Sequence, residues 1–157
     1  MKRPIKLSDI IDAMEFQPDE TTAFLNKETG EIVGVSDEEF RAAEEKRSLE
    51  SYPEWQRGLI REAAHILEDE KGRYIALPSR FDIHEYHMME RFALSVDDEF
   101  SAGLLAAIKG KGAFRRFKDG VRRFGIEEEW LKFRGAKFKE LAVDWCGENE
   151  VEYLDDL

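Results

Sequence analysis

The sequence has a single cysteine and no long apolar run, and each shortage excludes a class of protein. Cys146 has no second cysteine to pair with, so an intramolecular disulfide is impossible and a reducing compartment is favoured. A membrane-spanning helix needs about 18 apolar residues in succession, and no stretch approaches that length. We expect no signal peptide, because Ser8, Asp9 and Asp12 interrupt the segment after the basic start, Met1 to Pro4. These features predict a cytoplasmic protein without a membrane partner.

The common motifs of catalytic and metal-binding sites are also missing. The chain has no G-x-x-x-x-G-K-[ST] phosphate loop, no G-x-S-x-G nucleophile motif and no H-E-x-x-H pair. His84 and His87 are three residues apart, and two histidines at this spacing can share a metal, but no further ligand motif accompanies them. Cys146 follows Trp145 on an apolar face, which favours packing over nucleophilic chemistry. We assign no catalytic residue, metal ligand or cofactor, and the sequence leans towards a protein that is not an enzyme.

Positive charge is scarce overall and concentrated in one segment. The 157 residues carry 24 basic and 35 acidic side chains, and the net charge of −11 argues against a surface that binds nucleic acid on every side. Residues 109–123 nevertheless contain seven basic residues and one acid, so the other 142 residues carry −17. An acidic body with one basic face can bind a phosphate or a nucleic acid locally. It can equally bind an acidic partner or its own acidic tail.

Apolar periodicity and turn residues predict the fold class. Amphipathic spacing predicts helices over residues 7–16, 37–49, 55–69, 82–94, 97–109, 113–124 and 127–146. Strands are expected over residues 21–26, 31–35 and 73–77. The prediction is therefore an α+β fold, with a small antiparallel three-stranded sheet and a predominantly helical C-terminal half. The length, without repeats or linkers, favours a single domain of residues 1–157, with an acidic, flexible tail from about residue 147.

Three local patterns support these boundaries. Gly30 ends the connection between the first two strands, as in hairpin loops that need one residue at positive φ. Ser36 and Glu39 have the spacing of a capping box at a helix start. Asp82 and Glu85 repeat that spacing and predict a second capping box.

The predicted helix over residues 113–124 has an apolar stripe opposite a basic face. The stripe is predicted to face the core and consists of Phe114, Phe117, Val121 and Phe124. The basic face contains one acid, Asp119, and four arginines: Arg115, Arg116, Arg122 and Arg123. Pairs with Asp119 are worth only a few tenths of a kcal/mol each on an exposed helix, and one carboxylate cannot neutralise four guanidinium groups.

This basic face is the candidate binding site. Lys111 lies between two glycines just before the helix, where free backbone N–H groups and the helix dipole favour phosphate. Arginine side chains next to it can hold a phosphate through paired hydrogen bonds. Arg134 lies on the apolar face of the last helix and is either in an ion pair or in contact with a ligand. The hypothetical anion-binding residues are Lys111, Arg115, Arg116, Arg122, Arg123 and Arg134. A solvated face of an ordinary amphipathic helix is the alternative.

Three classes of function remain open. The preferred one is a non-enzymatic binding domain whose basic helix face holds an anionic ligand: a nucleic-acid backbone, a nucleotide or an acidic protein segment. A small metal-dependent hydrolase or nuclease is the second class, and it predicts three or more carboxylates in a pocket beside the basic helix. A protein-interaction adaptor without anion binding is the third, and it predicts an exposed apolar patch or a stable homodimer.

Several short motifs, in order, resemble those of a known family. Residues 26–31 resemble a D-x-x-T-G-E-V hairpin, with Asn26 in place of the aspartate, and residues 74–78 resemble Y-I-x-I-P. Residues 86–92 are similar to Y-x-x-M-x-x-F, residues 110–119 to G-x-G-A-F-R-R-F-K-D and residues 130–134 to W-x-x-F-R. The set resembles the uncharacterised bacterial protein family numbered 0158 in the UPF series. The resemblance implies a cytoplasmic bacterial protein and brings no established reaction or catalytic residue.

Overall fold

The computed structural model describes residues 4–157, and the basic start of the chain, Met1 to Arg3, lies outside the described residues. Contacts between residues divide the chain into two compact units. Unit 1 contains the residues up to Arg80 together with Ala142–Leu157, and unit 2 contains Phe81–Leu141. Because this division says nothing of whether either unit folds alone, the single domain stays a prediction.

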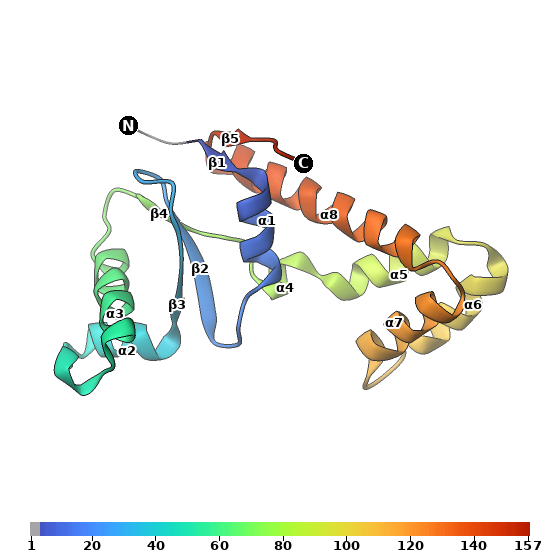
Figure 1. Ribbon diagram of the computed structural model, residues 1–157, viewed down its shortest axis with the longest axis horizontal. Coiled ribbons are helices and arrows are strands. Elements are labelled where there is room, and N and C mark those ends of the chain that lie inside the picture. Colours follow the sequence, from blue (N-terminus) through green and yellow to red (C-terminus); the bar gives the residue numbers. More distant parts are fainter. Residues whose placement is uncertain (1–3) are drawn as a thin grey trace. The chain divides into compact units, whose positions relative to one another are not determined.

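Unit 1 combines a small sheet with helices α1, α2 and α3 (Figure 1). Its elements, in chain order, are β1 (Ile5–Lys6), α1 (Leu7–Glu15), β2 (Thr21–Asn26), β3 (Ile32–Ser36), α2 (Asp37–Glu44), a 3-10 turn (Leu49–Ser51), α3 (Glu54–Leu67), β4 (Tyr74–Ala76) and β5 (Tyr153–Leu154). The three-stranded sheet is antiparallel, with the order β3-β2-β4. The central strand is therefore the first of the three in the sequence.

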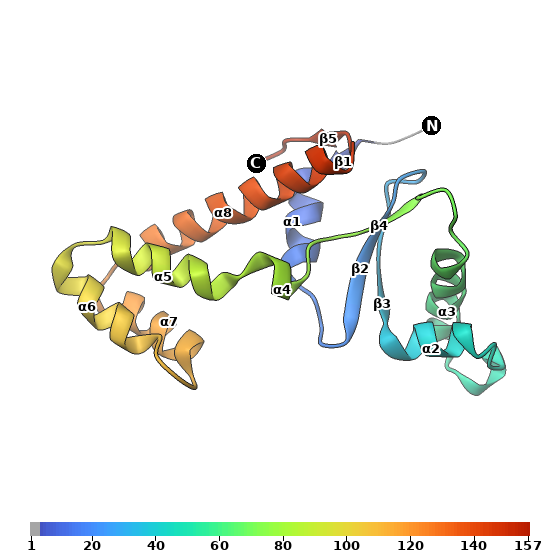
Figure 2. The same cartoon turned by 180° about the vertical axis from the view of Figure 1, so that it is seen from behind.

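Unit 2 is helical (Figure 2). Its elements are α4 (Arg80–Ile83), which begins at the boundary, α5 (Glu85–Ser95), α6 (Asp98–Ala107), α7 (Ala113–Arg123) and the first part of α8 (Glu127–Glu148). The last residues of α8 belong to unit 1. The predicted α+β class is confirmed, with its antiparallel three-stranded sheet and its predominantly helical C-terminal half.

The predicted hairpin and the first capping box are both present. Thr22 faces Val35 and Leu25 faces Ile32 across β2 and β3, and Gly30 closes the connection with a φ of 76°. The hydroxyl of Ser36 accepts a hydrogen bond from the backbone N–H of Glu39, and the Glu39 carboxylate accepts one from the backbone N–H of Ser36. Two otherwise unpaired backbone N–H groups are thereby satisfied where α2 begins.

The second predicted capping box is wrong. Asp82 lies inside the short helix α4, and α5 begins only after His84. His84 has a φ of 53°, in the left-handed region, and its side chain forms no capping hydrogen bond. The spacing of Asp82 and Glu85 arose by chance in a chain rich in acidic residues.

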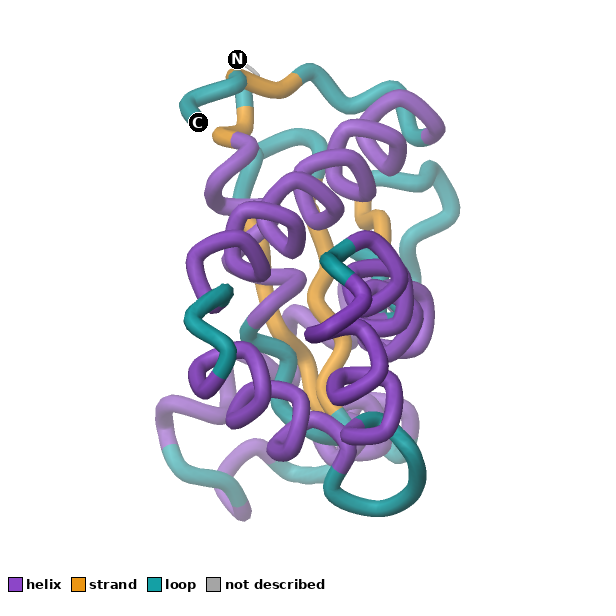
Figure 3. The backbone as a smooth tube through the Cα atoms, turned by 90° about the vertical axis from the view of Figure 1, so that its right-hand side faces the viewer, coloured by secondary structure: helices purple, strands orange, loops and turns teal. Residues whose placement is uncertain are grey.

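The C-terminal segment returns to the N-terminal part of unit 1. β1 and β5 form a parallel pair, and they lie next to each other beside the labelled chain ends (Figure 3). The hydroxyl and the backbone N–H of Ser8 donate to the Asp156 carboxylate at 2.5 and 3.0 Å, and they hold the pKa of Asp156 below its usual range. The indole N–H of Trp145 donates to the carbonyl of Ala76 at 3.0 Å. The sequence predicted no strand in this segment, and its expected flexibility stays a prediction.

Unit 2 is built around a cluster of aromatic side chains. Phe117 of α7 and Trp130 of α8 have ring centroids 4.7 Å apart, and Phe92 of α5 lies 5.4 Å from Trp130 and 6.2 Å from Phe117. All three residues are buried. The cluster confirms that Phe117 faces the core, and it fixes which side of α7 remains outside.

Helices α6 and α7 approach each other closely at glycines. A Cβ at Gly103 would lie 2.8 Å from the ring of Phe124, and a Cβ at Gly120 would lie 3.0 Å from a methyl group of Leu104. Real Cβ atoms do not approach a ring this closely, so the space at Gly103 is needed by Phe124. The two helices can pack at this distance because both positions lack a side chain.

We predict that Gly103→Ala lowers the free energy of unfolding by on the order of 1 kcal/mol, because the strain of an overpacked contact exceeds the gain in helix propensity. Gly135 is the matched control, since it lies in α8 of the same unit and a Cβ there would meet nothing within 4 Å. Gly135→Ala should raise the free energy of unfolding by about 0.5–1 kcal/mol. Urea denaturation followed by circular dichroism measures both changes, and a gain of stability in both variants would contradict the close approach.

Candidate functional site

The connection between α6 and α7 is held by one arginine. The guanidinium of Arg116 donates to the backbone carbonyl of Ala107 at 2.8 Å and also to the carbonyls of Lys109 and Lys111. The carbonyls at the end of a helix have no partner within the helix and carry a partial negative charge. Arg116 therefore satisfies the end of α6 and the loop after it, and it adds a positive charge where the helix dipole favours one.

The glycines of the loop make this arrangement possible. Gly110 and Gly112 have φ angles of 77° and 80°, which other residues rarely adopt. A Cβ at Gly112 would lie 3.0 Å from a guanidinium nitrogen of Arg116. The G-x-G pattern was interpreted from the sequence as part of an anion site, but the structure gives both glycines a role in closing the loop around Arg116.

Two more arginines of the predicted face have neighbours within the protein. The Nε of Arg122 lies 2.5 Å from a carboxylate oxygen of Glu127, and this hydrogen bond and ion pair raise the pKa of Arg122. Both side chains are largely exposed. The guanidinium of Arg123 lies 5.0 Å from the centre of the Phe124 ring. These side chains can still reach a ligand, but only in competition with the contacts that they already make.

Arg134 has the geometry of the ion pair that the sequence analysis considered. Its Nε lies 2.7 Å from a carboxylate oxygen of Glu85 in α5, and its guanidinium lies 4.3 Å from the centre of the Phe138 ring. The side chain is 23% exposed and that of Glu85 is 32% exposed. Arg134 is therefore not included in the candidate binding surface.

Two residues of the predicted set, and a third that was not predicted, form no ion pair among residues 4–157. Within the described part of the chain, Lys111, Arg115 and Lys118 form no ion pair and no side-chain hydrogen bond, and all three are exposed. Lys118 is three residues after Arg115, so the two side chains lie on the same side of α7. The predicted pairs with Asp119 do not form at salt-bridge distance among the described residues. Lys118 was not included in the predicted set, although its spacing of three residues from Arg115 can be read from the sequence.

Phe114 joins these cations on the outside of α7. The sequence analysis placed it in the core stripe, but its side chain is 48% exposed, whereas Phe117 and Val121 are buried. The buried side of α7 therefore contains Ala113, Phe117, Gly120 and Val121, and it does not include Phe114. We call Lys111, Phe114, Arg115 and Lys118 the α7 surface.

The backbone at the start of α7 matches the charge of this surface. Gly112 occupies the N-cap position and offers no side-chain hydrogen bond, and the first turn of α7 contains no acidic residue. The N–H groups of a first turn carry a partial positive charge. The α7 surface therefore combines three cations with an uncapped helix start.

The net charge is distributed unevenly between the two units. Unit 1 contains 12 basic and 24 acidic residues, whereas unit 2 contains 12 basic and 11 acidic residues. Unit 1 therefore has a net charge of −12 and unit 2 a net charge of +1, so the negative net charge of the chain comes from unit 1. An anionic ligand meets far less repulsion on unit 2, where the α7 surface lies.

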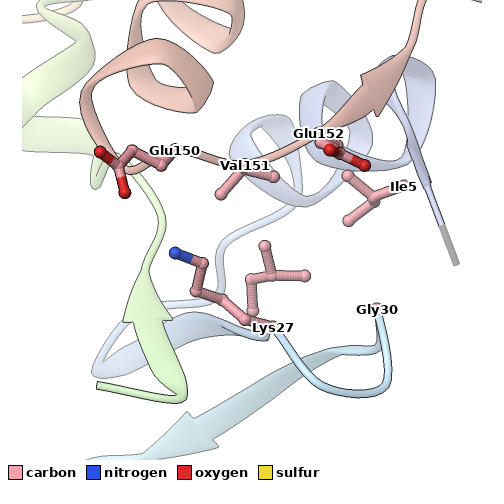
Figure 4. A pocket seen from close by; sticks show the side chains of 7 residues that line it. Ile5, Lys27, Gly30, Glu150, Val151 and Glu152 are labelled. Carbon is pink, nitrogen blue, oxygen red and sulfur yellow. The ribbon is translucent and has the colours of Figure 1, made fainter. Parts of the chain in front are cut away.

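A small cavity in unit 1 also brings charged and apolar side chains together. It has a volume of about 110 Å³ and is lined by Ile5, Leu25, Lys27, Gly30, Glu150, Val151 and Glu152 (Figure 4). The Lys27 amine extends towards the C-terminal segment, where it donates to the carbonyl of Asn149 at 2.8 Å. Ligand pockets usually measure about 300–1,000 Å³, so this cavity has room for water or a small ion and not for a nucleotide.

The structure offers little to the hydrolase alternative. Among residues 4–157, no group of three or more His, Cys, Asp or Glu side chains is placed to hold a metal ion. The carboxylate cluster that this alternative predicts is therefore not found in the part of the chain that the structure describes. The same residues include no helix that is both long and apolar enough to span a bilayer.

Comparison with known proteins assigns the chain to a family but identifies no activity. The model of the family described as "Uncharacterised protein family (UPF0158)" matches residues 2–156. No curated protein and no solved structure matches the chain.

We predict that Arg116→Ala destabilises the protein by about 1–3 kcal/mol, because three backbone carbonyls lose a charged donor. Arg116→Lys should recover little of this loss, since one ammonium group cannot reproduce the geometry of the guanidinium. Arg115→Ala is the matched control, and it should change the free energy of unfolding by less than about 0.5 kcal/mol. Equal stability of the Arg115→Ala and Arg116→Ala variants in urea denaturation would contradict the capping role.

The only cysteine should be inert in the folded protein. Burial raises the pKa of the Cys146 thiol to about 11, and its side chain is fully buried. The reactive thiolate is therefore scarce at pH 8. We expect a disulfide reagent to modify Cys146 at pH 8 only as fast as the protein unfolds, with rapid modification in urea. Fast modification of the native protein would reopen a nucleophilic role.

Proposed function

The chain belongs to the uncharacterised protein family UPF0158, and because that membership assigns no activity, we propose a function from the α7 surface alone. The proposed protein is a non-enzymatic binding domain that holds an anionic ligand against α7. The observation that carries this proposal is the set of exposed cations, Lys111, Arg115 and Lys118, to which the described part of the chain supplies no ion pair.

Three further features support the proposal. The start of α7 is uncapped, so its free N–H groups add to the positive potential. Arg122 and Arg123 lie on the same helix and are exposed, and a ligand with several negative charges can engage them after the first contacts are made. The ligand class is an anionic polymer or a phosphate compound: a nucleic-acid backbone, a nucleotide or an acidic protein segment.

The proposal places the protein in the bacterial cytoplasm. A single cysteine excludes an intrachain disulfide, and the thiol of Cys146 is buried in the core of unit 1. These features suit a reducing compartment, where nucleic acids and nucleotides are abundant.

The test measures binding of the full chain to labelled RNA, labelled duplex DNA, ATP and polyglutamate at low and at raised salt. For a nucleic acid, affinity should fall by about 0.7–0.9 log units per log unit of salt for each phosphate that is neutralised. Arg115→Glu combined with Lys118→Glu should weaken binding by roughly tenfold or more at low salt and make the salt dependence shallower by about two phosphate contacts.

The matched control is Arg61→Glu combined with Lys71→Glu. This pair changes the net charge by the same amount, and both residues are exposed in unit 1 and form no ion pair among residues 4–157. The control should bind within about twofold of the wild type, apart from the general effect of net charge at low salt. Equal losses in the two double variants would refute a role for α7, as would a wild type that binds none of the four probes.

A further inference from the structure

Phe114 is the one member of the α7 surface that a purely electrostatic site does not explain. Burying an aromatic side chain is strongly favourable, yet Phe114 leaves 48% of its side chain in solvent. Among residues 4–157 its ring meets no other aromatic ring and no cation at stacking distance. Its face is therefore available to a ligand.

The position of Phe114 relative to the cations is set by the helix. Lys118 follows it by four residues and Arg115 by one, so Lys118 lies one turn further along the same side of α7. Lys111 precedes it in the loop, between two glycines that leave the backbone bare of side chains. A planar apolar ring thus stands beside three cations that form no ion pair within residues 4–157.

From this arrangement, and resting on the proposed function, we propose that the ligand of the α7 surface is a single-stranded nucleic acid. One unpaired base stacks on Phe114, and Lys111, Arg115 and Lys118 contact the phosphates on either side of it. Surfaces that bind single strands combine a basic track for the backbone with aromatic rings for the bases. A nucleotide carries its phosphates in one short group beside its base, whereas these cations lie in a loop and along the start of α7 on either side of the ring.

The ring distinguishes a single strand from the other anionic polymers. In a duplex the bases are stacked on one another and turn only their edges to the groove, so the face of Phe114 would find no base to stack on. An acidic protein segment presents carboxylates without a planar partner for the ring. Either of these ligands would use the cations and leave Phe114 with little effect.

The experiment compares Phe114→Leu with the wild type in the full chain, with labelled single-stranded RNA, single-stranded DNA, duplex DNA and polyglutamate as probes. Leucine keeps an apolar side chain but has no aromatic face. We expect Phe114→Leu to lose between about 5- and 100-fold in affinity for single strands and to bind duplex DNA and polyglutamate as before. Phe114→Trp should retain the affinity for single strands. The wild-type salt dependence on single strands should have a slope of about −2, as expected for three neutralised phosphates.

Phe81→Leu is the matched control, because Phe81 lies in the same unit and is 82% exposed but belongs to α4. It should bind every probe as the wild type does. Ultraviolet cross-linking of a single strand, followed by peptide mass spectrometry, should mark the peptide that contains Phe114. The RNA and DNA arms show whether the 2′-hydroxyl contributes.

The outcomes separate the two proposals. If Phe114→Leu keeps its affinity for single strands while Arg115→Glu with Lys118→Glu loses it, the stacking proposal fails and the anionic surface stands. The same conclusion follows if the wild type prefers duplex DNA or polyglutamate. If the charge-reversal pair binds every probe as the wild type does, both proposals fail. A loss of fold in Phe114→Leu would show in its circular dichroism, and Phe114→Trp with the cross-linking then decides the question.

Discussion

The architecture of unit 2 depends on the contact between Arg116 and the carbonyls at the end of α6. A helix end must find donors for its last carbonyls, and here a single guanidinium serves Ala107, Lys109 and Lys111. This contact ties the end of α6 and the loop after it to the first turn of α7. Since α7 begins at Ala113, Phe117 reaches the aromatic cluster and Arg115 does not face back into the loop. The surface of α7 is thus a consequence of how α6 ends.

The candidate site could be located from the sequence but not resolved into its members. The charge of residues 109–123 pointed to α7, on which the proposed surface lies, because clustering of charge is visible without coordinates. Arg115 and Arg116 are adjacent and chemically identical, yet Arg115 is exposed and forms no ion pair with any described residue, whereas Arg116 supports the loop. The difference depends on where the carbonyls of α6 lie, which is a three-dimensional property. Phe114 was misplaced for a related reason, because a helical wheel gives direction but not the extent of the neighbouring core.

Most helices and strands were predicted from signals between residues that are close in the sequence. The pairings that were not predicted join residues that are far apart in the sequence. The hairpin of β2 and β3 was expected because turn chemistry and alternation act within a few residues. The order β3-β2-β4 depends on pairing across the intervening helices, and the pairing of β1 with β5 joins the two ends of the chain, so neither was predictable. The capping box predicted at Asp82 is absent, so the spacing of two residues does not by itself establish such a motif. Only the backbone shows that His84 breaks the helix there.

The division of the chain into units has a consequence for biosynthesis. Unit 2 is a continuous stretch of sequence, but unit 1 includes residues that leave the ribosome after all of unit 2. Trp145, which donates to Ala76, and the strand that pairs with Ile5 are synthesised after all other elements of unit 1. Unit 1 therefore gains its last contacts only after unit 2 has been synthesised, whereas unit 2 can assemble its helices earlier. A premature stop codon within residues 142–157 would leave α7 intact and remove the segment that completes unit 1.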